Sequence, residues 1–362
     1  MPRRLLCSRK LLCARDLRFS FEWPAICFLV SVTLSRAFPM EEASPKLHWF
    51  QYSLRSLLVF VTICAIPCSW FACKMVEANR QREVVAAIRK LKGGMMYDYH
   101  FGGDGRIIFD ANSPHPVWLR KHLGEDFLSD VVFVNLSETP VSNAGLEQLS
   151  GLPKLEWLIL DSTGVGNTGL EHFQRLTNIS NLSLYDTQVS DAGLQHLQGL
   201  TKLHYLCVSN TAVTDAGLEH LKGMANLERL YLSSTQVTDV GLGHLRGLTN
   251  LELLYLDRTE VTDAGLEHLK GLTSLEWLEL DGTQITDAGL EHLNGLTELE
   301  RLDLSDTQVT NAGLVYLKEL AKLKWLDLYG TIVTPEGVKE LQQALPNCEI
   351  KLLTAHIASF PR

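Results

Sequence analysis

The chain has 362 residues, of which 46% are apolar and 8% aromatic, with 26 glycines and 12 prolines. This composition is that of an ordinary globular protein, and the length allows two or more folding units. Charge is unevenly distributed, because residues 131–352 hold 30 acidic and 14 basic side chains, whereas residues 1–130 hold 12 and 18. An acidic surface repels phosphate backbones, so nucleic acid is excluded as a partner of the C-terminal part.

The eight cysteines predict neither a disulfide framework nor a zinc site. Six of them fall within the first 73 residues, and Cys207 and Cys348 stand far apart without CxxC spacing. We therefore expect no metal and no cofactor.

Residues 1–39 allow two interpretations. Six basic residues precede an apolar stretch, Ala25–Leu34, and this pattern resembles a signal sequence that directs export. Alternatively, translation begins at Met40, and residues 1–39 are an extension that is not part of the protein. The sequence leaves both interpretations open.

Ser56–Cys73 (residues 56–73) is predicted to be a transmembrane helix. Its 18 residues carry no charge, and a helix of this length can cross a bilayer. A buried core helix is the alternative, but no other part of the chain offers a packing partner. Lys and Arg are more frequent after the span than before it, which favours a cytoplasmic C-terminal side, whereas a signal sequence would favour export. The sidedness of the repeat domain stays open. The aromatic residues near the two ends suit membrane interfaces: Trp49, Phe50, Tyr52, Trp70 and Phe71.

Residues 75–93 are predicted to form a juxtamembrane helix, because Val84, Ile88 and Leu91 share one face and a Gly-Gly pair follows. Residues 94–130 are predicted to cap the end of the next domain.

Within this cap, two strand-like runs, Met96–Phe101 and Arg106–Asp110, flank the tetrapeptide GGDG, and Pro116–Leu123 is predicted to be a short helix. GGDG lacks the spacing of a phosphate-binding loop, so we expect a hairpin turn there.

Residues 131–352 consist of a repeat with a fixed period of 24. An L-x-x-L-x-L row precedes a Thr, and V-T-D-A-G-L-x-H-L follows it, without a single insertion between repeats. One such unit cannot bury its apolar face alone, so neighbours must stack into a continuous core. The fold class is therefore predicted to be α/β, a solenoid with a parallel β-sheet on its concave face and helices on its convex face. Nine threonines mark the period: Thr139, Thr163, Thr187, Thr211, Thr235, Thr259, Thr283, Thr307 and Thr331.

The repeat resembles the leucine-rich repeat family, and within it the F-box/cysteine-containing subtype seen in F-box substrate receptors. Thr stands here where the general pattern has Asn or Cys. The apolar span that precedes the repeats is similar to the arrangement in membrane-anchored bacterial proteins of this kind. The resemblance implies protein binding on a curved scaffold and implies no catalysis.

The last repeat indicates where each helix begins. Pro335 takes the place of the repeated Asp, and Pro is favoured at the first helical position, so Thr334 is predicted to be the N-cap. Asp is then expected to lie against the positive end of the helix dipole, and Gly to let the helix and strand layers approach closely. The equivalent caps are Ser142, Gly166, Ser190, Thr214, Thr238, Thr262, Thr286 and Thr310.

A column of histidines repeats at the same spacing. Two imidazoles on adjacent helices could reach a common zinc ion, but the repeat supplies no convergent third ligand, so we expect no metal site. We instead expect these side chains at the edge of the apolar helix face, with a mild sensitivity to pH and no settled role. They are His172, His196, His220, His244, His268 and His292.

The variable positions of the strands are predicted to form the binding surface. Aromatic residues and Arg, which dominate binding hot spots, recur there, and acidic residues fill the C-terminal half. Stacking of these aromatic residues on neighbouring repeats is the alternative explanation. The candidate partner-binding residues are Trp157, Tyr205, Arg229, Tyr231, Tyr255, Trp277, Glu279, Asp281, Arg301, Asp303, Trp325 and Asp327.

These patterns favour a membrane-anchored protein without enzymatic activity that binds a protein or peptide. Because the C-terminal half of the surface is acidic, we expect a partner with basic groups. One alternative is an F-box-like substrate adaptor for protein turnover. A weaker alternative is an enzyme that uses residues 94–130, a segment too short for a core of its own. The oligomeric state is not predicted.

Overall fold

The computed structural model describes residues 54–102, 106–108 and 111–352. The chain divides into two compact units, Met1–Ile66 and Pro67–Arg362. The interpretations of residues 1–39 concern a segment outside the described residues.

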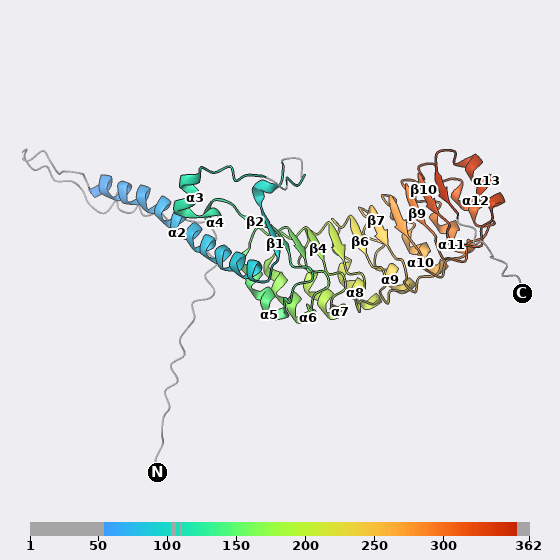
Figure 1. Cartoon of the computed structure of the whole chain (residues 1–362), viewed down its shortest axis with the longest axis horizontal. Helices are drawn as coiled ribbons and strands as arrows, with labels where there is room; N and C mark the ends of the chain where they lie inside the picture. Colours follow the sequence, from blue (N-terminus) through green and yellow to red (C-terminus); the bar gives the residue numbers. More distant parts are fainter. Residues whose placement is uncertain (1–53, 103–105, 109–110, 353–362) are drawn as a thin grey trace, which may run out of the picture. The chain divides into compact units, whose positions relative to one another are not determined.

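The second unit is built on one sheet of eleven strands in sequence order (Figure 1). The first strand, β1 (Gly94–Tyr97), runs antiparallel to its neighbour, and the ten that follow run parallel. These ten are β2 (Val131–Asn135), β3 (Trp157–Ile159), β4 (Asn181–Ser183), β5 (Tyr205–Cys207), β6 (Arg229–Tyr231), β7 (Leu253–Tyr255), β8 (Trp277–Glu279), β9 (Arg301–Asp303), β10 (Trp325–Asp327) and β11 (Glu349–Lys351).

The register follows from the period of the sequence. Each residue of a parallel strand pairs with the residue 24 positions later, as Leu254 pairs with Leu278 and Leu278 with Leu302. Because no repeat contains an insertion, equivalent side chains form straight columns across the sheet. The predicted solenoid of parallel strands is confirmed.

Short helices line the side opposite the sheet (Figure 1). In most repeats a single α-helical turn continues into a 3₁₀ turn, and only the last helix is longer. The helices are α5 (Asn143–Leu146), α6 (Asn167–Leu170), α7 (Asp191–Leu194), α8 (Asp215–Leu218), α9 (Asp239–Leu242), α10 (Asp263–Leu266), α11 (Asp287–Leu290), α12 (Leu314–Leu317) and α13 (Pro335–Ala344). The 3₁₀ turns after them are Glu147–Gly151, Glu171–Arg175, Gln195–Leu197, Glu219–Leu221, Glu267–Leu269 and Glu291–Leu293.

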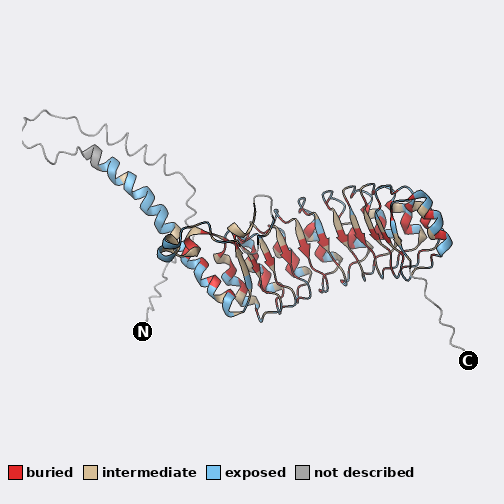
Figure 2. Cartoon of the chain, turned by 45° about the horizontal axis from the view of Figure 1, so that its top comes forward, coloured by how far each residue is buried: buried red, intermediate tan, exposed pale blue. Residues whose placement is uncertain are grey.

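The leucines of the repeat form the core between the two sides. Leu275, Leu278 and Leu280 are completely buried, as are their equivalents in the central repeats, and Figure 2 shows the buried residues running along the sheet. Burial of one such side chain contributes about 1.5–3 kcal/mol, so the row of leucines is the main source of stability.

The repeated Thr closes a tight turn after each strand. Its hydroxyl donates to the carbonyl of the third Leu of the row, over 2.6 Å from Thr259 to Leu256 and from Thr283 to Leu280. The residue before this Thr is left-handed in most repeats, with φ of 55° at Arg258 and 65° at Gly282. The buried hydroxyl thus gives this carbonyl a side-chain donor inside the turn, and the Leu280 carbonyl also accepts from the Thr283 N–H over 3.2 Å.

The cap prediction holds for the central and last repeats. The hydroxyl of Thr214 accepts a hydrogen bond from the N–H of Ala216, and that of Thr334 accepts from Gly337. At Ser142, Gly166 and Ser190 the backbone has the cap conformation but the side chain makes no cap bond. At Thr310 the hydroxyl accepts from Ala312, while the regular helix α12 starts only at Leu314.

The repeated Asp has a role that differs from the predicted one. Instead of serving only its own helix end, Asp215 accepts two hydrogen bonds from Thr238 of the next repeat, from the N–H over 2.7 Å and from the hydroxyl over 2.6 Å. The same pair of bonds joins the other repeats that carry Asp. The Asp therefore fastens each repeat to its successor.

The repeated Gly also serves the contact between repeats. A Cβ on Gly217 would lie 2.5 Å from the Asp191 carboxylate and 3.1 Å from the Leu194 side chain, both in the preceding repeat. The close approach that requires glycine is therefore between neighbouring repeats, and the expected approach between helix and strand layers is not its main cause.

One continuous helix, α2 (Leu54–Lys90), precedes the repeats. The sequence suggested two helices, but nothing between Cys73 and Glu77 interrupts the hydrogen-bonded backbone. By length and composition, Leu58–Lys90 includes a stretch apolar enough to cross a membrane, and that stretch is not buried against the protein. In its C-terminal part, Ala78, Val84, Val85 and Ile88 pack into the core of the repeats.

Residues 94–130 cover the first repeat. Strand β1 extends the sheet, and the helices α3 (Val117–Leu123) and α4 (Glu125–Leu128) follow. Gln81 of α2 binds this region through its amide, which donates to the Ser129 carbonyl over 2.8 Å and accepts from the Val131 N–H over 3.2 Å.

The expected hairpin around GGDG is described only at its base. An antiparallel bridge joins Phe101 and Ile107, and the Gly102 N–H donates to the Arg106 carbonyl over 2.8 Å. Residues 103–105 lie outside the described residues.

Candidate functional site on the sheet face

The side chains that point away from the core along β2–β11 form a surface that we call the sheet face. Strand pairing places Trp277, Arg301 and Trp325 next to one another in one column. The guanidinium carbon of Arg301 lies 4.8 Å from the ring centre of Trp277 and 3.9 Å from that of Trp325. Lys351, which pairs with Asp327 in the next column, also approaches the Trp325 ring, with its Nζ 5.2 Å from the ring centre. This alternation of rings and cations is stabilising in itself, as the stacking alternative predicts.

Tyrosines form a second stack in the middle of the sheet face. The rings of Tyr231 and Tyr255 lie parallel with centres 4.6 Å apart, and Tyr205 lies 5.1 Å from Tyr231. Burial, and then the charge of Glu279, raises the pKa of Tyr255 to about 12. The phenols are therefore neutral at physiological pH and present flat apolar rings beside hydroxyl groups.

Trp157 belongs to a third aromatic group at the N-terminal end. Its ring lies 6.2 Å from that of Phe133 and 6.4 Å from that of Phe101. Trp157 is thus far along the sheet from the other aromatic candidates.

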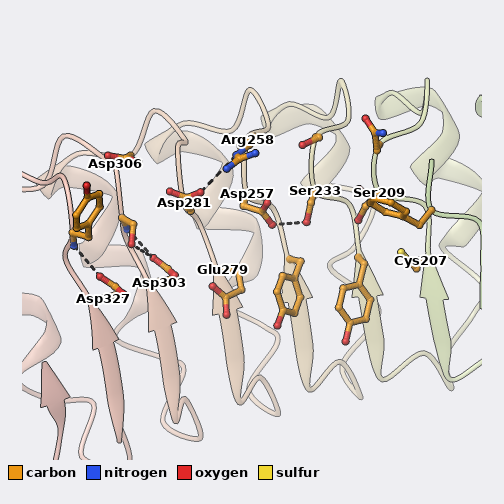
Figure 3. A pocket seen from close by; sticks show the side chains of 17 residues that line it. Cys207, Ser209, Ser233, Asp257, Arg258, Glu279, Asp281, Asp303, Asp306 and Asp327 are labelled. Atoms are coloured by element: carbon orange, nitrogen blue, oxygen red, sulfur yellow. Dashed lines mark hydrogen bonds and ion pairs between the residues drawn. The ribbon is translucent and has the colours of Figure 1, made fainter. Parts of the chain in front are cut away.

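A hollow of about 810 Å³ lies on the sheet face and extends from Tyr185, past Tyr231 and Tyr255, to Tyr329 (Figure 3). Its polar lining is mainly acidic and hydroxyl-bearing. Asp281 and Arg258 are joined by an ion pair, with 3.8 Å between Oδ2 and Nε. The lining consists of Tyr185, Cys207, Ser209, Asn210, Tyr231, Ser233, Ser234, Tyr255, Asp257, Arg258, Glu279, Asp281, Asp303, Ser305, Asp306, Asp327 and Tyr329.

Glu279 corrects one expectation. It was predicted to be an exposed acidic group, but only 7% of its surface is accessible. Its strand neighbours Tyr255 and Asp303 flank it, and the Arg301 Nε lies 3.7 Å from its carboxylate. Burial, and then the negative charge of Asp303, raises the pKa of Glu279 to about 8. Glu279 is therefore mostly protonated near neutral pH and contributes little negative charge to the hollow.

The other acids of the lining accept hydrogen bonds from neutral groups or repel one another. Asp303 accepts from the Ser305 N–H over 2.8 Å, and Asp327 accepts from the Tyr329 N–H over 2.9 Å. Asp257 accepts a hydrogen bond from the Ser233 hydroxyl. Burial, followed by the nearby charge of Asp303, raises the pKa of Asp281. A cationic group in the hollow would relieve this mutual repulsion.

The structure brings together only some of the predicted residues. Six of them line the hollow, and Trp277, Arg301 and Trp325 form the adjoining column. Tyr205 contacts the tyrosine stack, Arg229 is exposed outside the hollow, and Trp157 lies at the N-terminal end. The six that line the hollow are Tyr231, Tyr255, Glu279, Asp281, Asp303 and Asp327.

Four lining residues come from the turns and were missed. They directly precede the repeated Thr, and all four have the left-handed conformation described above. Their variation from repeat to repeat is the signal that could have found them, but the search was confined to strand positions. They are Asn210, Ser234, Arg258 and Asp306.

The histidine column lies outside the hollow, half-buried along the helix side. The Nδ1 of His220 lies 2.7 Å from the Gln198 amide of the preceding repeat. His268 lies against Arg246 in the same way, and burial followed by this positive charge lowers the pKa of His268. Among the described residues, no group of three or more His, Cys, Asp or Glu is arranged to hold a metal ion.

Comparisons with known proteins agree with this geometry. A family model described as leucine rich repeat matches residues 201–261 and 225–285, and a second model so described matches residues 296–318. Among solved structures, the chain is similar to an internalin, inlF, from Listeria monocytogenes, at 25% identity and a TM-score of 0.51. The similar region covers 61% of this chain and 59% of the inlF chain.

The chain is a leucine-rich repeat protein.

Two further solved structures are similar to this leucine-rich repeat protein. An internalin C2 from Listeria monocytogenes is 30% identical, with coverage of 60% and 87% of the two chains and a TM-score of 0.45. A leucine-rich repeat protein from Leptospira interrogans is 17% identical, with coverage of 61% and 72% and a TM-score of 0.39. No curated protein matches the sequence. The similarity to inlF supports the solenoid fold, whereas the F-box subtype finds no support in these comparisons.

Proposed function

We propose that this leucine-rich repeat protein binds a protein or peptide partner with basic side chains through its sheet face, while α2 anchors it in a membrane. The observation that carries the proposal is the hollow, because it combines stacked tyrosine rings with six acidic side chains, of which, in the described chain, only Asp281 and Glu279 each form an ion pair with an arginine. The proposed function is binding without catalysis.

The charge of the lining supports a basic partner. Five aspartates line the hollow, and its single basic residue, Arg258, is already paired with Asp281. Asp303 and Asp327 are held by neutral donors only in the described hydrogen bonds. Asp303 and Asp327 are strand neighbours, so a guanidinium or ammonium group could contact both carboxylates. Hydrogen bonds between two charged groups are roughly twice as strong as those between neutral groups.

The tyrosines support a partner with long basic side chains. Tyr185 and Tyr329 are exposed at the two ends of the hollow, and Tyr231 and Tyr255 lie between them. Arg in particular stacks on aromatic faces while its charge pairs with a carboxylate. The hollow thus offers both contacts that an Arg-containing peptide uses.

The lining favours binding over acid–base catalysis. It contains no histidine, and burial raises the pKa of its one thiol, Cys207, so that the thiol is protonated. The lining serines Ser233 and Ser305 donate to the carboxylates of Asp257 and Asp303, which are weak bases, and the lining has no histidine or lysine to activate a nucleophile. The enzyme alternative, which placed a site in residues 94–130, gains no support, because these residues are occupied in covering the first repeat.

Membrane anchoring is supported by the exposed apolar surface of α2. Phe60, Ile63 and Ile66 are each more than 60% exposed, which is unusual for a soluble helix. A bilayer would cover this surface along about 20 helical residues. The substrate-adaptor alternative has no supporting observation, because α2, β1, α3 and α4 take the place before the repeats in the described chain.

A peptide titration tests the binding proposal. A probe peptide rich in Arg and Tyr, and its counterpart with Glu for every Arg, are titrated into the full chain in detergent by calorimetry. We expect only the basic peptide to bind, and we expect the triple substitution Asp257→Asn, Asp281→Asn and Asp303→Asn to weaken it.

The matched control carries three equal charge changes on exposed helix positions, Glu219→Gln, Glu267→Gln and Glu291→Gln. Equal weakening by both triple substitutions would show a general charge effect and would contradict a specific site in the hollow.

A further inference from the structure

Large apolar side chains are exposed at the N-terminal end of the repeats. In α3, Val117 is 71% exposed and Trp118 is 64% exposed. Within residues 119–352, all of which the structure describes, the exposed large apolar side chains are Tyr185, Val240, Val315, Tyr329 and Ile332, and no two of them are adjacent in sequence. The concentration of such side chains near α2 calls for an explanation that the sheet face does not provide.

Helix α3 is held beside the middle of α2 (Figure 1). The ring of Phe127, in the adjoining α4, lies 5.2 Å from that of Phe71 and 6.5 Å from that of Trp70. The last residue of α3, Leu123, accepts a hydrogen bond from Arg82 of α2 over 3.2 Å. These contacts fix α3 and α4 to the part of α2 that follows Pro67.

Along the same part of α2, the side chains change from exposed to buried against the repeats. Trp70 and Phe71 are exposed on an otherwise apolar surface, whereas Ala78 and Gln81, two to three turns later, are buried against the repeats. Lys74 lies between them and forms an ion pair with Asp130 over 3.0 Å. If α2 spans a bilayer as proposed above, the lipid headgroups lie at this transition, because Trp and Lys favour that depth.

The chemistry of α3 suits the same depth. Trp118 combines an apolar ring with a polar N–H and is exposed next to Val117. One turn later, Lys121 and His122 are also exposed, and no acidic residue lies within α3. Apolar rings beside basic groups are the composition of interfacial helices, which bind the headgroup region and favour anionic lipids.

We infer that α3 rests on the lipid headgroup surface beside α2, with Val117 and Trp118 inserted at the interface. The inference rests on the proposed membrane anchor and extends it. Seven residues are too few to hold a protein on a membrane alone, so α3 acts as a second contact. This contact would fix the orientation of the first repeats relative to the bilayer, and α2 by itself could not, since a single helix can rotate about its axis.

Quenching by brominated lipids tests the inference. The full chain is reconstituted in vesicles of phosphatidylcholine and phosphatidylglycerol, with and without lipids brominated near the headgroup end of the acyl chains. The quenched part of the tryptophan emission is measured for the wild type and for Trp70→Phe, Trp118→Phe and Trp325→Phe. We expect Trp118→Phe and Trp70→Phe each to reduce the quenched emission, and Trp325→Phe, at the far end of the sheet, to leave it unchanged.

Each other outcome is decisive. A loss of quenched emission in Trp70→Phe but not in Trp118→Phe would overturn the inference and leave the anchor intact. If neither substitution reduces the quenched emission, the anchor itself is wrong. Because Trp118 is exposed, its replacement by Phe does not threaten the fold.

Discussion

The carboxylate of Asp263 accepts two hydrogen bonds from Thr286, one from the N–H over 2.8 Å and one from the hydroxyl over 2.6 Å. The two residues belong to successive repeats. Thr286 also accepts a cap bond from Ala288, so a single side chain begins its own helix and joins the preceding repeat. The most constant segment of the repeat is thus a connector between repeats.

Removal of this connector should destabilise the solenoid. We expect Asp263→Ala to lower the free energy of unfolding by about 1.5–3 kcal/mol, since two hydrogen bonds to a charged group are lost. Asp263→Asn should cost much less, because Asn311 already makes the equivalent contacts with Thr334 in the last repeats. Denaturant unfolding measures both, with Glu267→Ala as an exposed control in the same repeat. A cost for Asn as large as for Ala would contradict this role.

The repeated glycine offers a steric test of the same contact. Gly217→Ala should destabilise the protein by about 1–3 kcal/mol, because the added Cβ would overlap the Asp191 carboxylate 2.5 Å away. Gly223→Ala, six positions before strand β6, is the matched control, since a Cβ there meets nothing within 4 Å. Thermal unfolding of the two variants should differ. Equal midpoints would show that Gly217 is not needed for packing between repeats.

The raised pKa of Glu279 predicts that the stability of the fold depends on pH. Its pKa rises from an ordinary 4.5 to about 8 on folding, so the folded state holds the proton more tightly than the unfolded state. Its contribution is therefore most favourable below pH 4.5 and is lost as the pH rises toward 8, by at most about 1.4 kcal/mol per pH unit. Compared with the wild type, Glu279→Gln should gain stability between pH 5 and 8.

Urea unfolding at several pH values measures this difference, with Glu291→Gln, on the exposed helix side, as the control. A constant difference between wild type and Glu279→Gln across this range would mean that Glu279 ionises normally.

The position of Arg301 between two tryptophan rings predicts that this stacking stabilises the fold. It lies between Trp277 and Trp325 and also faces Glu279 over 3.7 Å. Arg301→Lys should lower stability by about 0.5–2 kcal/mol, because Lys cannot stack its charge flat between two rings. Arg229→Lys, at an exposed position of the same column, should be neutral within the error of the measurement. Similar effects of both substitutions would argue against the stacked arrangement.

The sequence predicted the solenoid and its register because the physics of the repeat is local. A constant spacing of 24 places Leu254 beside Leu278, and burial of the leucine rows then leaves one arrangement of strands. The N-cap at Thr334 followed from one substitution, Pro335, whose fixed backbone geometry has a single good position in a helix.

The features that the sequence did not predict depend on contacts between different repeats and different columns of the sheet. Thr286, which donates both hydrogen bonds to Asp263, is 23 residues away. Nothing in the sequence of a single repeat shows that the Asp263 carboxylate points toward the next repeat. Glu279 looks like a surface acid on its strand, and only the bulk of Tyr255 and Arg301 beside it explains its burial. The hollow likewise requires the turn residue Arg258, whose orientation depends on a left-handed backbone.

An unbiased selection of peptides tests the central claim, that the sheet face binds basic partners through the hollow. A library of random peptides displayed on phage is selected on the full chain in lipid nanodiscs. Selected peptides should be enriched in Arg and Lys, and their binding should be lost with Asp257→Asn, Asp281→Asn and Asp303→Asn while surviving Glu219→Gln, Glu267→Gln and Glu291→Gln. Peptides without basic enrichment, or peptides that bind the first triple variant as well as the wild type, would contradict the account.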